Sequence, residues 1–182
     1  KSYIDMIDTN ALLLCDTYKT CHGRMYPNSL KKLVSYWVPR KSMFKIEENQ
    51  KMVFFGLQAF IQEYLVEYFD KNFFSVPLDE VLATYRKYLN IQLGEGNYDI
   101  DKIVNLHKLG YLPLHISAMP EGTKVNMGVP CIRVVNTDDR FAWLVQWIEC
   151  ILQSELWKTC NHATIGNMYY KLAKLWYGHN VD

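Results

Sequence analysis

Several features that would place a sequence in a class at once are missing from these 182 residues. No apolar run approaches the roughly 20 residues that a membrane-spanning helix needs. Residues 1–10 are polar and lack the apolar segment of a signal peptide, so we expect none. The five cysteines are odd in number, irregularly spaced and without a C-x-x-C pair, which argues against a disulfide framework and a structural zinc site. We therefore expect reduced thiols, no membrane partner and a cytoplasmic location.

The common catalytic motifs are missing as well. The sequence contains no G-x-S-x-G, no H-E-x-x-H and no G-x-x-x-x-G-K, and no two of its five histidines lie four residues apart. The net charge is only +1, from 20 basic and 19 acidic residues, which gives no reason to expect a nucleic-acid partner. The sequence thus predicts no catalytic residue and no metal site within this segment.

Aromatic residues, by contrast, are abundant, with 13 Tyr, 8 Phe and 5 Trp. One interpretation is a core built largely from rings, because large rings are mostly buried. The other is a surface that stacks on flat ligands or on a second subunit, where Tyr and Trp are favoured. Composition favours the core without excluding the surface.

The spacing of apolar residues predicts an α+β fold, a helix-rich domain with a small mixed or antiparallel sheet. The stretch 15–29 is polar and is expected to be a loop. Strands are expected over residues 33–38, 114–118 and 131–135. Five helices are expected. The first runs from an N-cap at Asn49 to Phe69, the second begins after Pro77, and the third covers 99–108. The fourth runs from an N-cap at Thr137 to Leu152, and the fifth covers 163–177.

The loop holds the most chemically varied cluster in the chain. Asp16, Tyr18, Lys19 and His22 place a carboxylate, a ring, an amine and an imidazole close together. Binding residues are concentrated in such loops. The plainer interpretation is a surface turn in which Asp16 caps the backbone and Tyr18 packs on the body, and composition alone favours it.

An ordered series of motifs resembles the N-terminal part of the nicotinamide phosphoribosyltransferase family. The motifs cover most of residues 11–160, and the match thins beyond them. They are D-T-Y-K-x-x-H at 16–22, Y-P-N at 26–28, S-Y-W-x-x-R at 35–40, V-F-F-G-L-Q at 53–58, P-L-x-I-x-A-x-P-E-G at 113–122, N-T-D at 136–138 and W-L-x-x-W-I-E-x-I-L at 143–152.

The resemblance implies the N-terminal domain of a type II phosphoribosyltransferase over residues 1–160. Residues 161–182 would form a helix leading toward a catalytic α/β barrel that this sequence does not include. The family makes nicotinamide mononucleotide and pyrophosphate from nicotinamide and phosphoribosyl pyrophosphate, with Mg²⁺ bound alongside the latter, as a step in NAD salvage. The ligands of Mg²⁺ are not expected in this segment.

Three substrate-binding residues follow from the resemblance. Tyr18 matches the ring that stacks on nicotinamide, Asp16 the acidic residue beside it, and Arg40 a basic residue that approaches the phosphates. They would complete the site of the partner subunit in a homodimer. The residues directly before Arg40, Trp37 to Pro39, differ from the family's usual ones.

Three interpretations therefore remain at this point. The first is part of a phosphoribosyltransferase that is inactive as a fragment. The second is a non-catalytic remnant, a scaffolding or binding module with the same fold. The third is a relative that acts on nicotinate, which this segment cannot distinguish from nicotinamide.

Overall fold

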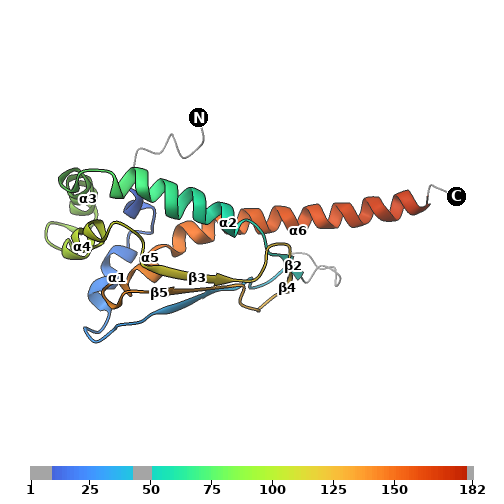
Figure 1. Cartoon of the computed structure of the whole chain (residues 1–182), viewed down its shortest axis with the longest axis horizontal. Coiled ribbons are helices and arrows are strands. Elements are labelled where there is room, and N and C mark those ends of the chain that lie inside the picture. The colour runs from blue at the N-terminus through green and yellow to red at the C-terminus, as the bar shows by residue number, and fades with distance from the viewer. Residues whose placement is uncertain (1–9, 43–50, 180–182) are drawn as a thin grey trace.

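The computed structural model describes residues 10–42 and 51–179, and a three-stranded antiparallel sheet lies along the lower side of the body in the view of Figure 1. The strands are β1 (Val34–Trp37), β5 (Ile132–Asn136) and β3 (Leu114–Ala118), in the order β1-β5-β3. Each begins and ends within one residue of a predicted strand. The middle strand is buried along most of its length, whereas β1 alternates between exposed and half-buried residues. The prediction of an α+β fold with a small antiparallel sheet is confirmed.

A second, two-stranded sheet was not predicted. β2 (Lys51–Val53) pairs with β4 (Lys124–Asn126) in antiparallel register. The helix predicted to start near residue 49 therefore starts later. Gly56, with φ of +99°, separates β2 from that helix, because a left-handed backbone and a Cβ only 2.4 Å from Thr159 Oγ1 would exclude a larger residue.

The helix after Gly56 is continuous and lies above the three-stranded sheet (Figure 1). It consists of α2 (Leu57–Phe60) followed by two π-helical stretches, η4 (Ile61–Tyr68) and η5 (Asp70–Phe74). The predicted N-cap, Asn49, lies outside the described residues. The apolar spacing predicts a stripe made of Phe54, Leu57, Ile61, Tyr64, Leu65 and Tyr68. Leu57, Leu65 and Tyr68 are buried and Ile61 and Tyr64 are half-buried, while Phe54 is buried but precedes the helix. Phe60, Phe69 and Phe73 are buried in addition.

The next two helices form where the sequence predicts them. α3 (Leu78–Leu93) begins directly after Pro77, and α4 (Asp101–Leu109) begins two residues later than expected. Gly94 and Gly110 end them with φ values of +81° and +79°. Such positive φ values favour glycine at helix C-termini.

The stretch 15–29, predicted as a loop, contains a helix. A 3₁₀ turn, η2 (Ala11–Leu13), precedes it and is capped by the side chain of Asn10. The helix is α1 (Lys19–Met25), which begins immediately after Tyr18. It is short and buries only its first two residues, so it left no apolar period in the sequence.

The C-terminal region also departs from the prediction. Asp138, not Thr137, caps the 3₁₀ turn η6 (Asp139–Phe141) by accepting a hydrogen bond from the backbone N–H of Arg140. After α5 (Leu144–Trp147), one helix, α6 (Glu149–His179), replaces the separate helices predicted on either side of residues 153–162. No proline follows Pro130 in the sequence, so nothing in this region forces a break.

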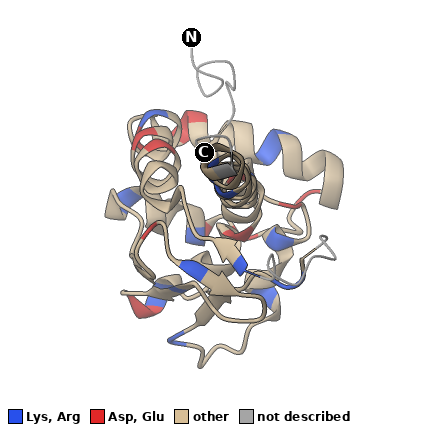
Figure 2. Ribbon diagram, turned by 90° about the vertical axis from the view of Figure 1, so that its right-hand side faces the viewer, with Lys and Arg blue, Asp and Glu red and all other residues tan. Residues whose placement is uncertain are grey.

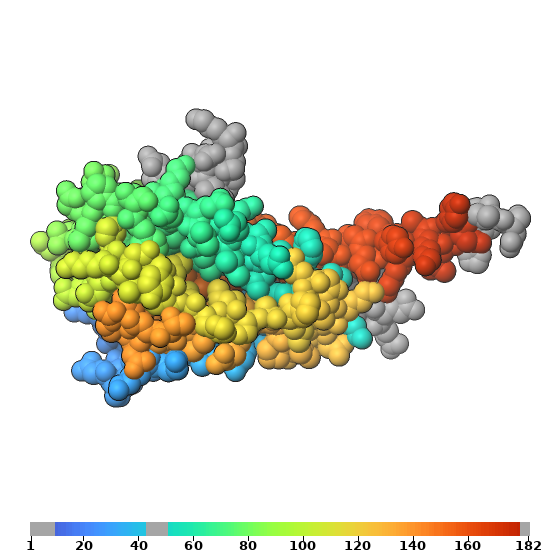
Figure 3. All heavy atoms as spheres, in the orientation of Figure 1, coloured from blue at the N-terminus to red at the C-terminus, as the bar shows by residue number. Residues whose placement is uncertain are grey.

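The two halves of α6 have different surroundings. The first half packs on α2, α5 and β2, and its buried residues are Ile151, Leu152, Leu156, Cys160 and Thr164. The second half projects away from the body (Figure 3) and exposes Tyr169, Tyr170, Leu172, Leu175, Trp176 and Tyr177. The helix passes through residue 160 without interruption, and the predicted domain division there stays a prediction.

The described rings are divided between the core and the surface, so the structure bears out neither interpretation of the composition alone. The largest fully buried side chains include Tyr68, Tyr85, Phe54, Phe73 and Phe141. Basic and acidic residues are interspersed along the chain (Figure 2). No helix in the described ranges is both long and apolar enough to cross a membrane.

Candidate functional site

The Tyr18 turn, residues 15–19, connects η2 to α1. The backbone N–H groups of Lys19 and Thr20 donate to the carbonyls of Asp16 and Thr17 at 2.9 and 3.1 Å, and the Thr20 hydroxyl donates to Thr17 O at 2.6 Å. These bonds wind the chain into the first turn of α1 and satisfy donors that a helix start leaves unpaired. The Tyr18 side chain remains 55% exposed.

The segment before the turn is fixed to α5 in the core. The indole Nε1 of Trp147 donates to Leu12 O at 2.8 Å, and this bond is buried. The Cys15 thiol donates to the same carbonyl at 3.4 Å. Burial, followed by the nearby Cys150 and Asp16, raises the pKa of Cys15 to about 12, so this thiol stays protonated near neutral pH.

Lys19, the residue after Tyr18, is the buried charge of the turn. Only 3% of its side chain is exposed, and its ammonium donates to the Glu149 carboxylate at the start of α6. The same nitrogen lies over the Tyr18 ring, 5.3 Å from the centroid. Burial alone would lower the pKa of Lys19, but the hydrogen bond and charge of Glu149 outweigh it and raise the pKa above its ordinary value. A buried lysine needs such a partner.

Asp16, on the other side of Tyr18, is bound to the next residue of α6. Its backbone N–H donates to Cys150 Sγ at 3.2 Å, and the Cys150 thiol donates to Asp16 Oδ2 at 3.2 Å. Burial raises the pKa of Cys150, which keeps the thiol in the protonated form that can donate. Two consecutive residues of α6, Glu149 and Cys150, therefore contact the turn on both sides of Tyr18.

The Tyr18 ring also belongs to a small aromatic row along α1. The His22 ring lies 5.1 Å from it, tilted by 57°, and the Tyr26 ring lies 6.4 Å from His22. Tyr26 is half-buried, and burial raises the pKa of its hydroxyl. The exposed Tyr18 ring therefore packs against the His22 ring.

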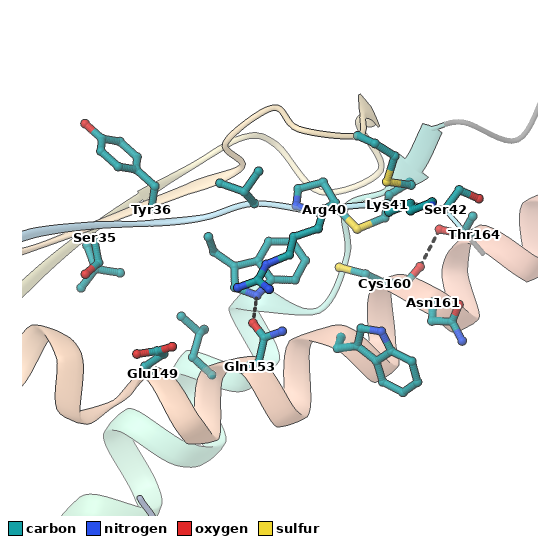
Figure 4. Close-up of a pocket in the computed structure, with 18 of the residues that line it drawn as sticks. Ser35, Tyr36, Arg40, Lys41, Ser42, Glu149, Gln153, Cys160, Asn161 and Thr164 are labelled. Carbon is teal, nitrogen blue, oxygen red and sulfur yellow. Dashed lines mark hydrogen bonds between the residues drawn. The ribbon is translucent and has the colours of Figure 1, made fainter. Parts of the chain in front are cut away.

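Arg40 lies in a groove of about 940 Å³ between the end of β1 and α6. Figure 4 shows its side chain pointing from the strand end into this groove, toward α6. Trp37 Nε1 donates to Gln153 Oε1 at 2.8 Å and so fixes the strand end to the helix. Trp157, Asn161 and Glu149 also line the groove. The groove thus combines an exposed cation with aromatic and amide surface.

The structure brings the three predicted binding residues to two places. Asp16 and Tyr18 belong to one turn, as their spacing implied, and Arg40 lies in the groove. Glu149 belongs to both, because it binds Lys19 and lines the groove. Within the described ranges, no group of three or more His, Cys, Asp or Glu side chains could hold a metal ion.

Glu149, Cys150 and Gln153 were not predicted as site residues from the sequence. Their contacts with the turn and the strand end span more than 100 residues of chain, which no local pattern reveals. A signal was nevertheless present, since Glu149 belongs to the W-I-E motif already identified at the end of the resemblance.

A family model matches the first part of the chain. The model described as nicotinamide phosphoribosyltransferase, N-terminal domain, matches residues 10–116, which is more than half of the chain. The chain belongs to the nicotinamide phosphoribosyltransferase family. The match covers both the Tyr18 turn and Arg40.

Individual relatives extend the similarity beyond residue 116. A protein of Acinetobacter baylyi named nicotinamide phosphoribosyltransferase is 42% identical over 166 residues, 90% of this chain and 33% of the relative. A protein of the same name from Xanthomonas campestris pv. campestris is 25% identical over 156 residues, 86% of this chain and 30% of the relative. The chain spans about a third of the length of the curated relatives it matches.

Family membership defines what this segment is. It is the N-terminal domain of the nicotinamide phosphoribosyltransferase family, with a helix-rich body around a small antiparallel sheet. Roughly two thirds of each relative has no counterpart here.

Proposed function

We propose that this chain is part of an enzyme that transfers the phosphoribosyl group from phosphoribosyl pyrophosphate to nicotinamide, in NAD salvage. In that reaction the ring nitrogen of nicotinamide forms a bond to the ribose C1. The bond from C1 to pyrophosphate breaks, and its electrons leave with the pyrophosphate. The products are nicotinamide mononucleotide and pyrophosphate.

The observation that carries the proposal is the exposed Tyr18 ring on an anchored turn. A flat phenol ring can stack on the electron-poor pyridine ring of nicotinamide. Tyr18 is 55% exposed, while Asp16 and Lys19 beside it are hydrogen-bonded to α6. The ring can therefore contact a ligand while the turn stays in place. Asp16 would lie beside the bound ring, as the family resemblance implies.

Arg40 is proposed to approach the phosphate groups. A guanidinium can bind a phosphate through two parallel hydrogen bonds, and Arg40 is exposed within the groove. Mg²⁺ would neutralise charge on the pyrophosphate leaving group when bound with that substrate. We assign it no ligand in this segment, because the resemblance implies that its ligands lie in a part of the family that this chain does not include.

The site is proposed to be shared between two subunits of a homodimer, with Tyr18 contributing to the partner's site. An exposed stacking residue on a domain that lacks a catalytic motif favours completion in trans, and two-fold dimers are the commonest assemblies. Light scattering on the complete protein should report a dimer. A fully active monomer would contradict the shared site. A cytoplasmic location, expected from the free cysteines, also stays a prediction.

The decisive experiment compares the 182-residue chain with the complete protein. Each is incubated with nicotinamide, phosphoribosyl pyrophosphate and Mg²⁺, and nicotinamide mononucleotide is measured by chromatography. We expect product from the complete protein and none from the chain alone, because most of the relatives' length is missing from it.

The other outcomes have defined meanings. Product from the isolated chain would contradict the incomplete site. A complete protein that is inactive on nicotinamide but active on nicotinate would indicate the nicotinate-specific relative. Activity on neither substrate would favour a non-catalytic binding module.

A further inference from the structure

Lys19 is the least exposed charged side chain in the Tyr18 turn, and the proposed reaction assigns it no role. Charged residues are almost never fully buried unless they are paired. Its carboxylate partner, Glu149, is itself 57% exposed, so the pair lies at the boundary of the body rather than within the core. The ammonium lies between this carboxylate and the Tyr18 ring.

Two residues of α6 contact the chain on either side of Tyr18. Cys150 binds Asp16, two residues before Tyr18, and Glu149 binds Lys19, the residue after it. The backbone on both sides of the ring is therefore held by one helix turn. A cation over the ring adds an electrostatic preference for one ring orientation.

We propose that Lys19, held by Glu149, is a positioning residue that sets the orientation of the Tyr18 ring for stacking on the substrate. The inference rests on the proposed function, because it assumes that Tyr18 contacts nicotinamide. Lys19 itself would not touch the substrate. It would act by limiting the rotation of the Tyr18 side chain, so that less conformational freedom is lost when nicotinamide binds.

The main test replaces Lys19 by methionine in the complete protein. Lys19→Met keeps most of the buried stem and removes the charge. We expect the nicotinamide KM to rise roughly two- to thirty-fold, the range that a lost cation–π contact spans. The kcat and the KM for phosphoribosyl pyrophosphate should change less than twofold. Lys19→Arg keeps the cation and should restore most of the affinity.

Lys102→Met is the matched structural control. Lys102 is a half-buried lysine that donates to Gly23 O of α1 at 2.7 Å and pairs with Asp99, but it has no contact with Tyr18. Its loss should lower the melting temperature and leave the nicotinamide KM unchanged. If Lys102→Met raises that KM as much as Lys19→Met does, Lys19 only stabilises α1 and the inference is overturned.

A double-mutant cycle with Tyr18→Ala tests the route of the effect. If Lys19 acts through the ring, Lys19→Met should not raise the KM further once Tyr18 is alanine. Additive effects would show that Lys19 acts elsewhere. Should Lys19→Met fail to fold, Glu149→Gln replaces it in the same cycle. That variant keeps the shape and an acceptor oxygen, removes the charge, and should raise the KM by a smaller factor.

A crystal structure of the Lys19→Met protein separates this inference from the proposed function. We expect the Tyr18 ring to be displaced or to occupy more than one rotamer. A ring in its original place at full occupancy would overturn the inference even if the enzyme is active. A wild-type protein that neither binds nor converts nicotinamide would overturn the proposed function, and with it the role of Lys19.

Discussion

The two segments that carry the candidate binding residues are held in different ways. The Tyr18 turn is fixed by Glu149, Cys150 and its own backbone bonds, and it presents a ring with two rotatable side-chain angles. Arg40 follows a strand whose end is fixed by the bond from Trp37 to Gln153, and it extends a long side chain into an open groove.

The difference matches what each group would do. Stacking of two flat rings depends on their angle and separation, so a stacking residue benefits from a fixed orientation. Attraction between a guanidinium and a phosphate acts over a longer distance and tolerates movement of the stem. We therefore expect changes at the turn to act through orientation and changes at Arg40 to act through charge.

The largest expected effect concerns the thiol at the base of the turn. Cys15, whose pKa is about 12, should react with iodoacetamide at pH 8 roughly a thousand times more slowly than in the denatured chain, because only the thiolate reacts. Mass spectrometry of the Cys15 peptide, labelled in folded and in denatured protein, gives both rates. Fast labelling of Cys15 in folded protein would show that the turn opens. The turn would then not be held more firmly than the Arg40 side chain.

Tyr18→Ala should have the next largest effect. It removes a stacking contact of about 0.5–1.5 kcal/mol and apolar burial of about 1–2 kcal/mol, so the nicotinamide KM should rise roughly ten- to several-hundred-fold. Tyr18→Phe keeps the ring and should stay within a few-fold of the wild type. The measurement is steady-state kinetics on the complete protein, with its melting temperature. An early-melting alanine variant with a normal KM would make Tyr18 a packing residue.

Arg40→Ala should act on the other substrate. A hydrogen bond to a charged group contributes about 1.5–3 kcal/mol, so the KM for phosphoribosyl pyrophosphate should rise roughly ten- to 150-fold while the KM for nicotinamide changes little. Because Arg40 is exposed, the free energy of unfolding should change by less than about 0.5 kcal/mol. Arg40→Lys keeps the charge and should recover part of the affinity. An effect on nicotinamide alone would contradict the assignment.

Cys150→Ala should have the smallest effect. It removes the hydrogen bonds to Asp16 but leaves Lys19 and Glu149 in place, so the nicotinamide KM should rise roughly two- to fivefold. Cys150→Ser keeps a donor and an acceptor at the same position and is the matched control, with a KM near that of the wild type. If both variants have the nicotinamide KM of the wild type, Lys19 and Glu149 hold the turn without Cys150.

Local sequence patterns predicted some elements well. β1 and β5 follow runs of β-branched and aromatic residues, and β3 follows an alternation of apolar and polar residues. α3 and α4 end at glycines with positive φ. The two-stranded sheet was missed because each of its strands has only three residues, too few to show an alternating period. The continuity of α6 was missed because its polar residues around 153–162 resemble a break.

The candidate site was predicted only in part, because local sequence patterns do not show contacts between distant parts of the chain. Asp16, Tyr18 and Arg40 were found through ordered motifs, and the family model confirmed the family but does not test their roles. Lys19 was noticed as one member of a polar cluster, with no indication that it would be buried.

The sequence by itself determined the family, the α+β class and the local positions of most strands and helices, because these depend on residues close together in the chain. Only the tertiary structure decided that a lysine in a polar segment is buried, that Glu149 and Cys150 hold the turn, and that Arg40 enters a groove beside α6. The contacts of α6 with the turn join residues 130 or more positions apart. Such contacts form only when α6 packs against the start of the chain, and no local period or propensity encodes them.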